Sequence, residues 1–148
     1  MADVEVGQEA PDFKLRNEDL QEVKLSELRG SPVVLVFYPA AFSGLCTKEL
    51  CGIRDDFSEF EKHGAKVFGI SGDNPFALKA FREQERLAHP LLSDIKGEVA
   101  ASYGAWNEQF GVAERLTVVI DKDGIIRYVV HNGMPEARDH KEAIAALA

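Results

Sequence analysis

The sequence predicts an α/β fold in which a central mixed β-sheet is flanked by helices. Buried strands are expected at residues 33–38, 66–71 and 116–120, because each run is rich in β-branched and aromatic residues. Segments with helical patterning separate these runs, and strands that alternate with helices are typical of α/β proteins. The 148 residues contain no repeat and no low-complexity linker, so we expect a single domain over residues 1–148.

Shorter elements complete the predicted sheet. Two N-terminal strands are expected around residues 13–15 and 23–25, with a polar turn between them. A single helical turn at residues 26–30 follows them. After the last buried strand, an Asp-Lys-Asp-Gly turn leads into residues 125–130, which predicts an antiparallel hairpin.

Helices are expected between and after the strands. The longest predicted helix covers residues 43–63 and ends before Gly64. The next begins with Asn74 as N-cap and Pro75 at its first position, and continues to about Arg86. Two further helices are expected at residues 98–103 and 139–147. This order of elements predicts an α/β sandwich of the thioredoxin type.

Composition excludes several classes of partner and site. With 25 acidic and 17 basic residues, the net charge of −8 disfavours nucleic acid and anionic membrane surfaces. The N-terminus lacks the pattern of a signal peptide, and no apolar run reaches the ~18 residues of a membrane span. We therefore expect a cytoplasmic protein. Two cysteines are too few for a disulfide framework. The four histidines are scattered and do not form a metal-binding pattern, so we expect them on the surface or in loops.

Cys46 occupies a position that favours an ionised thiol. It follows the buried run 33–38 closely and lies at the expected start of the long helix. Unpaired backbone N–H groups and the positive end of the helix dipole stabilise a thiolate there. The alternative is an inert core residue, because a cysteine on an apolar helix face often acts as a small hydrophobe. The strand-to-helix turn favours the reactive interpretation.

The second sulfur, Cys51, is expected on another side of the same helix. Cys46 begins an apolar stripe, whereas Cys51 lies five residues further on and falls on the polar side. In an ideal helix the Cα atoms of such a pair are about 8.7 Å apart, and a disulfide needs them within about 7 Å. A bond between the two therefore requires local unwinding, which Gly52 makes easier.

Several motifs of this sequence resemble those of the peroxiredoxins. Pro39, Ser43 and Cys46 match their P-x-x-x-[T/S]-x-x-C signature. The resemblance extends over nearly the whole chain, through segments 7–13, 90–94, 103–104 and 117–124. Segments 37–44 and 106–109 are most similar to the alkyl hydroperoxide reductase E group. The C-x-x-x-x-C spacing from Cys46 to Cys51 instead resembles the Q-type, or bacterioferritin comigratory protein, group.

The resemblance implies a role for each residue of the site. Cys46 would be the peroxidatic cysteine, whose thiolate attacks a peroxide and becomes a sulfenic acid. Arg115 and the Ser43 hydroxyl would stabilise the departing oxygen, and Pro39 would shape the pocket and exclude water. Glu49 would orient the site. The alternatives are that Arg115 is a surface salt-bridge partner of a neighbouring carboxylate, Glu114 or Asp121, and that Glu49 is an exposed helix charge.

The resemblance also implies how the enzyme is recycled. Cys51 would condense with the sulfenic acid, and a thioredoxin-, glutaredoxin- or mycoredoxin-like protein would reduce the disulfide. No metal or organic cofactor is expected. In the alternative one-cysteine mechanism, Cys51 is a bystander and external thiols recycle Cys46. Two rival functions are a thiol–disulfide oxidoreductase, which would need a C-x-x-C spacing, and a peroxide sensor or holdase, which would not turn over. A homodimer is expected, with Phe42, Phe76 and Trp106 as candidate contacts.

Overall fold

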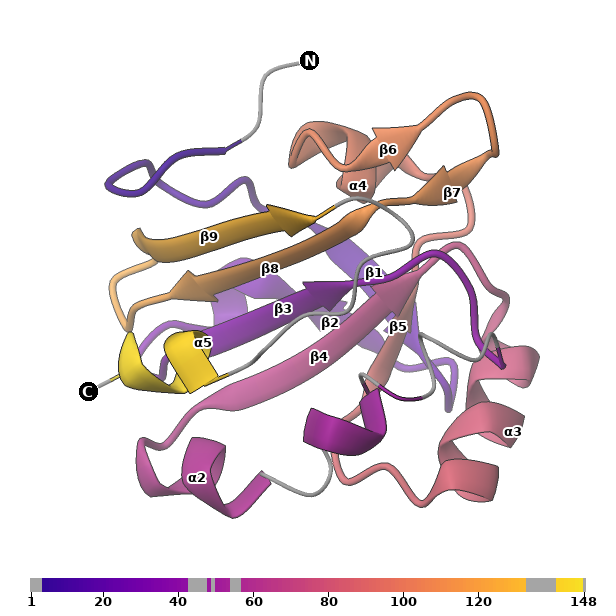
Figure 1. The fold of residues 1–148 in the computed structure, drawn as a ribbon, viewed down its shortest axis with the longest axis horizontal. Coiled ribbons are helices and arrows are strands. Elements are labelled where there is room, and N and C mark those ends of the chain that lie inside the picture. Colours follow the sequence, from indigo (N-terminus) through magenta and orange to yellow (C-terminus); the bar gives the residue numbers. More distant parts are fainter. Residues whose placement is uncertain (1–3, 43–47, 49, 54–56, 133–140, 148) are drawn as a thin grey trace.

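The computed structural model describes residues 4–42, 48, 50–53, 57–132 and 141–147 (Figure 1). Its elements, in chain order, are β1 (Lys14–Asn17), β2 (Glu22–Lys24), η1 (Leu25–Leu28), β3 (Val33–Phe37), α2 (Phe57–Lys62), β4 (Lys66–Ser71), α3 (Pro75–Glu85), β5 (Leu91–Ser93), α4 (Glu98–Ser102), β6 (Trp106–Asn107), β7 (Val112–Ala113), β8 (Arg115–Ile120), β9 (Ile126–Asn132) and α5 (Lys141–Ala145).

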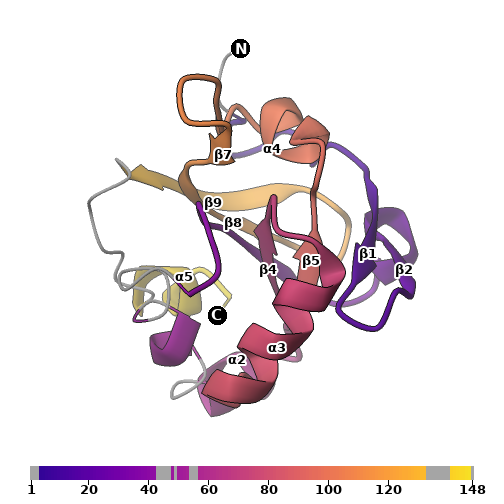
Figure 2. The same cartoon turned by 90° about the vertical axis from the view of Figure 1, so that its right-hand side faces the viewer.

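Seven strands form one mixed sheet in the order β2-β1-β5-β4-β3-β8-β9. β3 runs parallel to β4 and antiparallel to β8, and β4 runs parallel to β5. Helices lie on both faces of this sheet, with α2, α3 and α5 on one side and α4 on the other (Figure 2). The predicted α/β class, with a central mixed sheet and flanking helices, is therefore confirmed.

β3 separates two apolar cores. Val33, Leu35 and Phe37 point into a core that includes α4, which we call the α4-side core. The intervening residues, with Tyr38 after them, point into a core built with α2, α3 and α5, which we call the α3-side core. Every residue of β3 is buried. This explains why the strand reads as a continuous apolar run: both of its faces are covered.

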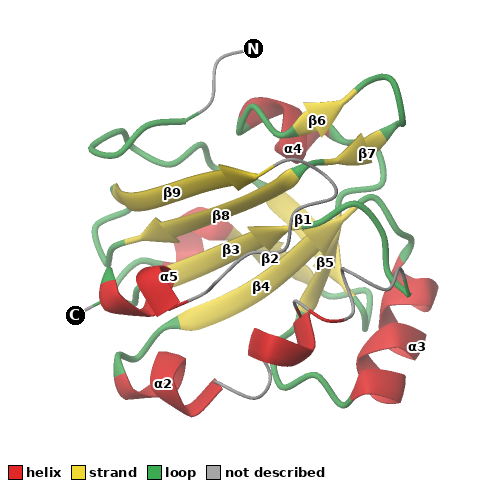
Figure 3. Cartoon of the chain, viewed as in Figure 1, coloured by secondary structure: helices red, strands yellow, loops and turns green. Residues whose placement is uncertain are grey.

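The predicted starts and stops of most elements agree with the structure. The Asn74 side chain accepts a 2.9 Å hydrogen bond from the Ala77 N–H, and Pro75 opens α3 as expected. The β8–β9 hairpin is present, and Asp121 Oδ1 accepts the backbone N–H groups of Asp123 and Ile125 across its turn. Figure 3 shows how strands and helices alternate along the chain.

The structure adds strands that the sequence did not predict. β5 has three residues and lies between β1 and β4 in the sheet, whereas β6 and β7 form a two-residue pairing of their own. Such short strands carry no readable periodicity, because pairing with distant segments stabilises them. No helix in the described parts of the chain is long and apolar enough to cross a membrane.

The predicted long helix at residues 43–63 is only partly within the described chain. Lys48, residues 50–53 and α2 are helical. Leu50, Ile53 and Phe60, which belong to the predicted apolar stripe, are fully buried. The stripe is thus confirmed at these positions.

Candidate active site

Two predicted site residues, Pro39 and Arg115, lie where β3 ends and β8 begins. β3 ends at Phe37, which pairs with Leu116 of β8. Pro39 lies just beyond the end of β3, and Arg115 is the first residue of β8. Because the two strands are antiparallel, the end of β3 and the start of β8 meet there. Ser43, Cys46 and Glu49 lie outside the described residues, so their predicted roles remain predictions.

Arg115 is a buried cation. Its exposure is 3%, so the alternative of a surface salt bridge is wrong. The two carboxylates considered as its partners bind other groups: Glu114 Oε1 lies 2.9 Å from His131 Nε2, and Asp121 Oδ2 lies 2.6 Å from Arg127 Nε. Burial of a guanidinium is costly unless hydrogen-bond acceptors surround it. Arg115 therefore places a buried positive charge where β3 ends and β8 begins.

A carboxylate that the sequence analysis missed holds the loop after β3. Asp73 Oδ2 accepts hydrogen bonds from the Ala41 N–H at 2.7 Å and from the Ser71 hydroxyl at 2.6 Å. The Ser93 hydroxyl donates to the Asp73 carbonyl at 2.6 Å. Asp73 thus joins the loop after β3 to the ends of β4 and β5. An acidic residue two positions after a buried parallel strand was the signal available in the sequence.

The last described residue of this loop has an unusual backbone. Phe42 has a φ of 64°, in the left-handed region, which bulky residues rarely adopt. Its ring packs against Phe81 of α3, with the ring centroids 5.0 Å apart. Outliers of this kind concentrate at functional sites, where the surrounding structure holds them in place. The contact with Phe81 and the neighbouring Asp73–Ala41 hydrogen bond supply that support.

Cys51 is a half-buried thiol in the helical residues 50–53. Its expected position on the polar side was wrong, because it packs against the α3-side core. The helical pattern of the sequence could not show that the end of α3 lies beside Cys51. The Cys51 Sγ lies 3.5 Å from Oε2 of Glu85, the last residue of α3.

His89 is buried near the same helix. It lies in a loop, as expected, but its side chain is fully buried. Burial lowers the pKa of His89 to about 4, with a smaller contribution from Arg82, while the carbonyls of Pro90 and Leu50 oppose this shift. The ring Nδ1 lies 3.4 Å from the Pro90 carbonyl oxygen, but Nε2 has no partner in hydrogen-bonding geometry among the described residues. His89 is therefore neutral at pH 7.

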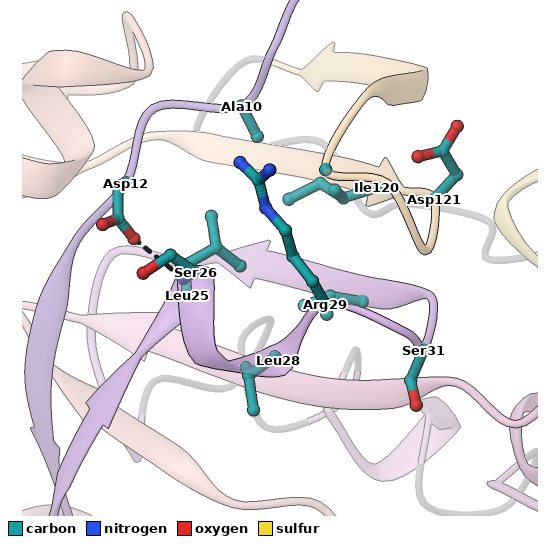
Figure 4. Close-up of a pocket in the computed structure, with 11 residues that line it drawn as sticks. Ala10, Asp12, Leu25, Ser26, Leu28, Arg29, Ser31, Ile120 and Asp121 are labelled. Carbon is teal, nitrogen blue, oxygen red and sulfur yellow. Dashed lines mark hydrogen bonds between the residues drawn. The ribbon is translucent and has the colours of Figure 1, made fainter.

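A small cavity lies at the other end of the central strands (Figure 4). It has a volume of about 20 Å³ and is lined by Val33 and Ile120, which start β3 and end β8. That volume holds about one water molecule. The cavity is thus separate from the end that carries Pro39 and Arg115. No cluster of three metal-ligating side chains is found in the described parts of the chain.

Comparisons with known proteins show the family to which this fold belongs. The model of the AhpC/TSA family matches residues 6–129. Chloroplastic peroxiredoxin Q of Oryza sativa subsp. japonica is 42% identical over 145 residues, which are 97% of this chain and 67% of that protein. Alkyl hydroperoxide reductase E of Mycobacterium tuberculosis (strain CDC 1551 / Oshkosh) is 43% identical over 148 residues, covering 96% of this chain and 97% of that protein.

Solved structures show the same similarity in three dimensions. The crystal structure of peroxidoxin BcpB from Mycobacterium tuberculosis has a TM-score of 0.88 and 37% identity, covering 96% of this chain and 95% of that one. Reduced 2-Cys peroxiredoxin from Plasmodium vivax has a TM-score of 0.89 and 27% identity, covering 96% and 79%. The predicted thioredoxin-like fold and the intermediate position between the E and Q groups are confirmed. The chain belongs to the AhpC/TSA family and is a peroxiredoxin, a thiol-dependent peroxidase.

Proposed function

We propose that the protein reduces hydrogen peroxide and organic hydroperoxides through the thiolate of Cys46. The observation that carries this proposal is the buried Arg115 at the start of β8. Arg115 lies where β3 ends. The loop of residues 39–42 follows β3 there and leads along the chain to Cys46. A guanidinium at that position favours a thiolate and binds an anionic leaving oxygen.

The first half-reaction transfers two electrons from sulfur to the peroxide. The Cys46 thiolate attacks one peroxide oxygen, an S–O bond forms, and the O–O bond breaks. The departing oxygen takes a proton and leaves as water or alcohol, and Cys46 becomes a sulfenic acid. In this scheme Arg115, the Ser43 hydroxyl and the Cys46 N–H stabilise the charge on the departing oxygen, while Pro39 excludes water and Glu49 orients the site.

The second half-reaction restores the thiol. Cys51 condenses with the sulfenic acid, which releases water and forms a disulfide with Cys46. A thioredoxin-, glutaredoxin- or mycoredoxin-like dithiol protein then reduces this disulfide. The spacing of the two cysteines supports this role, and it requires residues between them to leave the helical conformation. The cycle needs no metal or organic cofactor, because the thiolate is both nucleophile and electron donor.

We also propose that the chain acts as a cytoplasmic, single-domain homodimer. Phe42 and Phe76 expose 47% and 73% of their surface, and two exposed aromatic residues support an interface near the site. Trp106 is a weaker candidate because it is half-buried and packs against the α4-side core. One relative is bacterial, although the plant relatives are named chloroplastic.

Intact mass after one equivalent of peroxide tests the mechanism. A Cys46–Cys51 disulfide is about two mass units lighter than the reduced protein, whereas a sulfenic acid is about sixteen units heavier.

Cys46→Ser should abolish peroxide consumption with the fold unchanged, and consumption near the parent rate would falsify its assignment. Cys51→Ser should be oxidised as fast as the parent but accumulate sulfenic acid. A parent protein that persists as a dimedone-trappable sulfenic acid follows the one-cysteine mechanism instead.

A further inference from the structure

The contact between Cys51 and Glu85 joins two segments that are far apart in the sequence. The Cys51 thiol donates to Oε2 of Glu85 over 3.5 Å, and the two residues are 34 positions apart. Both side chains are half-buried. Cys51 also packs against the α3-side core. This thiol is therefore held against the end of α3 by a polar contact and an apolar one.

A carboxylate in contact with a thiol opposes its ionisation. The thiolate is the reactive form of cysteine, and it would place a negative charge beside that of Glu85. Partial burial strengthens this repulsion because less water screens it. His89 interacts with the Leu50 carbonyl of the same helix, but its lowered pKa of about 4 leaves it neutral at pH 7. Glu85 thus places a carboxylate directly against the Cys51 thiol.

We propose that Glu85 is a positioning residue that keeps Cys51 neutral and turned toward α3 until Cys46 has been oxidised. The inference rests on the proposed resolving role of Cys51. In this scheme, the unwinding that disulfide formation requires moves Cys51 away from α3 and breaks its contact with Glu85. The freed thiol then loses its proton to solvent, and its sulfur attacks the sulfur of the sulfenic acid. The S–O bond breaks, and the released hydroxide takes up a proton to give water.

The first test measures the reactivity of Cys51 in the resting protein. Iodoacetamide is applied across a pH series in a Cys46→Ser background, so that Cys51 is the only thiol. Glu85→Gln keeps an acceptor oxygen but removes the charge, and it should raise the alkylation rate at neutral pH about tenfold. Its pH profile should move to lower pH. Glu85→Asp retains the charge, so its profile should stay closer to that of the parent.

The matched control is Glu83→Gln, which removes an exposed carboxylate from the same helix. Its alkylation profile should follow that of the parent. If Glu85→Gln has the parent profile, or if Glu83→Gln shifts it equally, Glu85 has no specific control over Cys51. Circular dichroism of each variant confirms that the helices are intact.

The second test follows disulfide formation with both cysteines present. After one equivalent of peroxide, samples are acid-quenched and their masses recorded over time. Glu85→Gln should leave the first oxidation unchanged and form the disulfide several-fold faster. A slower disulfide step would overturn the proposal, because Glu85 would then assist the reaction by accepting the Cys51 proton. If the parent forms no disulfide, the resolving role itself fails, and the alkylation profiles still decide whether Glu85 controls this thiol.

Discussion

Acidification should destabilise this protein through His89. The imidazole is buried and has a pKa of about 4 in the folded state, against 6.5 for an ordinary histidine. Below pH 6.5 the unfolded chain binds a proton that the folded chain does not bind until about pH 4. His89 therefore contributes its full stabilisation of the folded state above pH 6.5, and this contribution is lost as the pH falls toward 4. At 1.36 kcal/mol for each pKa unit, the full loss is about 3 kcal/mol.

Urea unfolding at pH 7.5 and pH 4.5 measures this effect. His89→Leu removes the titrating group, so the variant should lose about 2 kcal/mol less than the parent between these two pH values. His63→Leu, which removes a half-buried histidine after α2, serves as the matched control and should follow the parent. Equal losses in the parent and His89→Leu would refute the reasoning. An NMR titration that places the pKa of His89 near 6.5 would refute it independently.

Four further substitutions test the site and the fold. Arg115→Lys keeps the positive charge but loses the planar guanidinium fork. Peroxide reduction measured by stopped flow should therefore slow much more than the pKa of the Cys46 thiol changes. Effects of equal size would show that Arg115 acts through its charge alone. Gly52→Ala has open space for its Cβ and should stabilise the helix by about 1 kcal/mol, which would slow disulfide formation about fivefold in quenched mass spectra. Gly97→Ala combines a φ of +71° with a Cβ 2.6 Å from the Trp106 ring, and should lower unfolding free energy in urea by about 2–3 kcal/mol. Gly111→Ala, with positive φ but open space, should lose only about 1 kcal/mol.

Much of the fold follows from local patterns in the sequence. β3 and β8 were predictable because strands buried on both faces leave long apolar runs. The start of α3 was predictable because Asn74 and Pro75 act on their own helix. β5 was not, because its three residues depend on pairing with β1 and β4.

The candidate site likewise combines residues that the sequence pointed to and contacts that it did not reveal. The resemblance to the peroxiredoxins made Pro39, Ser43, Cys46 and Arg115 candidate site residues, the first three through a short motif. The Asp73–Ala41 hydrogen bond and the Cys51–Glu85 contact each join segments more than thirty residues apart. No local pattern encodes such contacts, so they became visible only once the three-dimensional arrangement was known.

The backbone of Phe42 has an energetic consequence for the proposed cycle. A left-handed conformation costs about 1–2 kcal/mol for a residue with a side chain, and the resting protein carries this cost at the entrance to the proposed catalytic segment. Unwinding of the following helix would allow Phe42 to return to ordinary backbone angles. The energy regained would offset part of the helical hydrogen bonds lost in reaching the disulfide. In the proposed cycle, this would bring the resting and oxidised conformations closer in free energy.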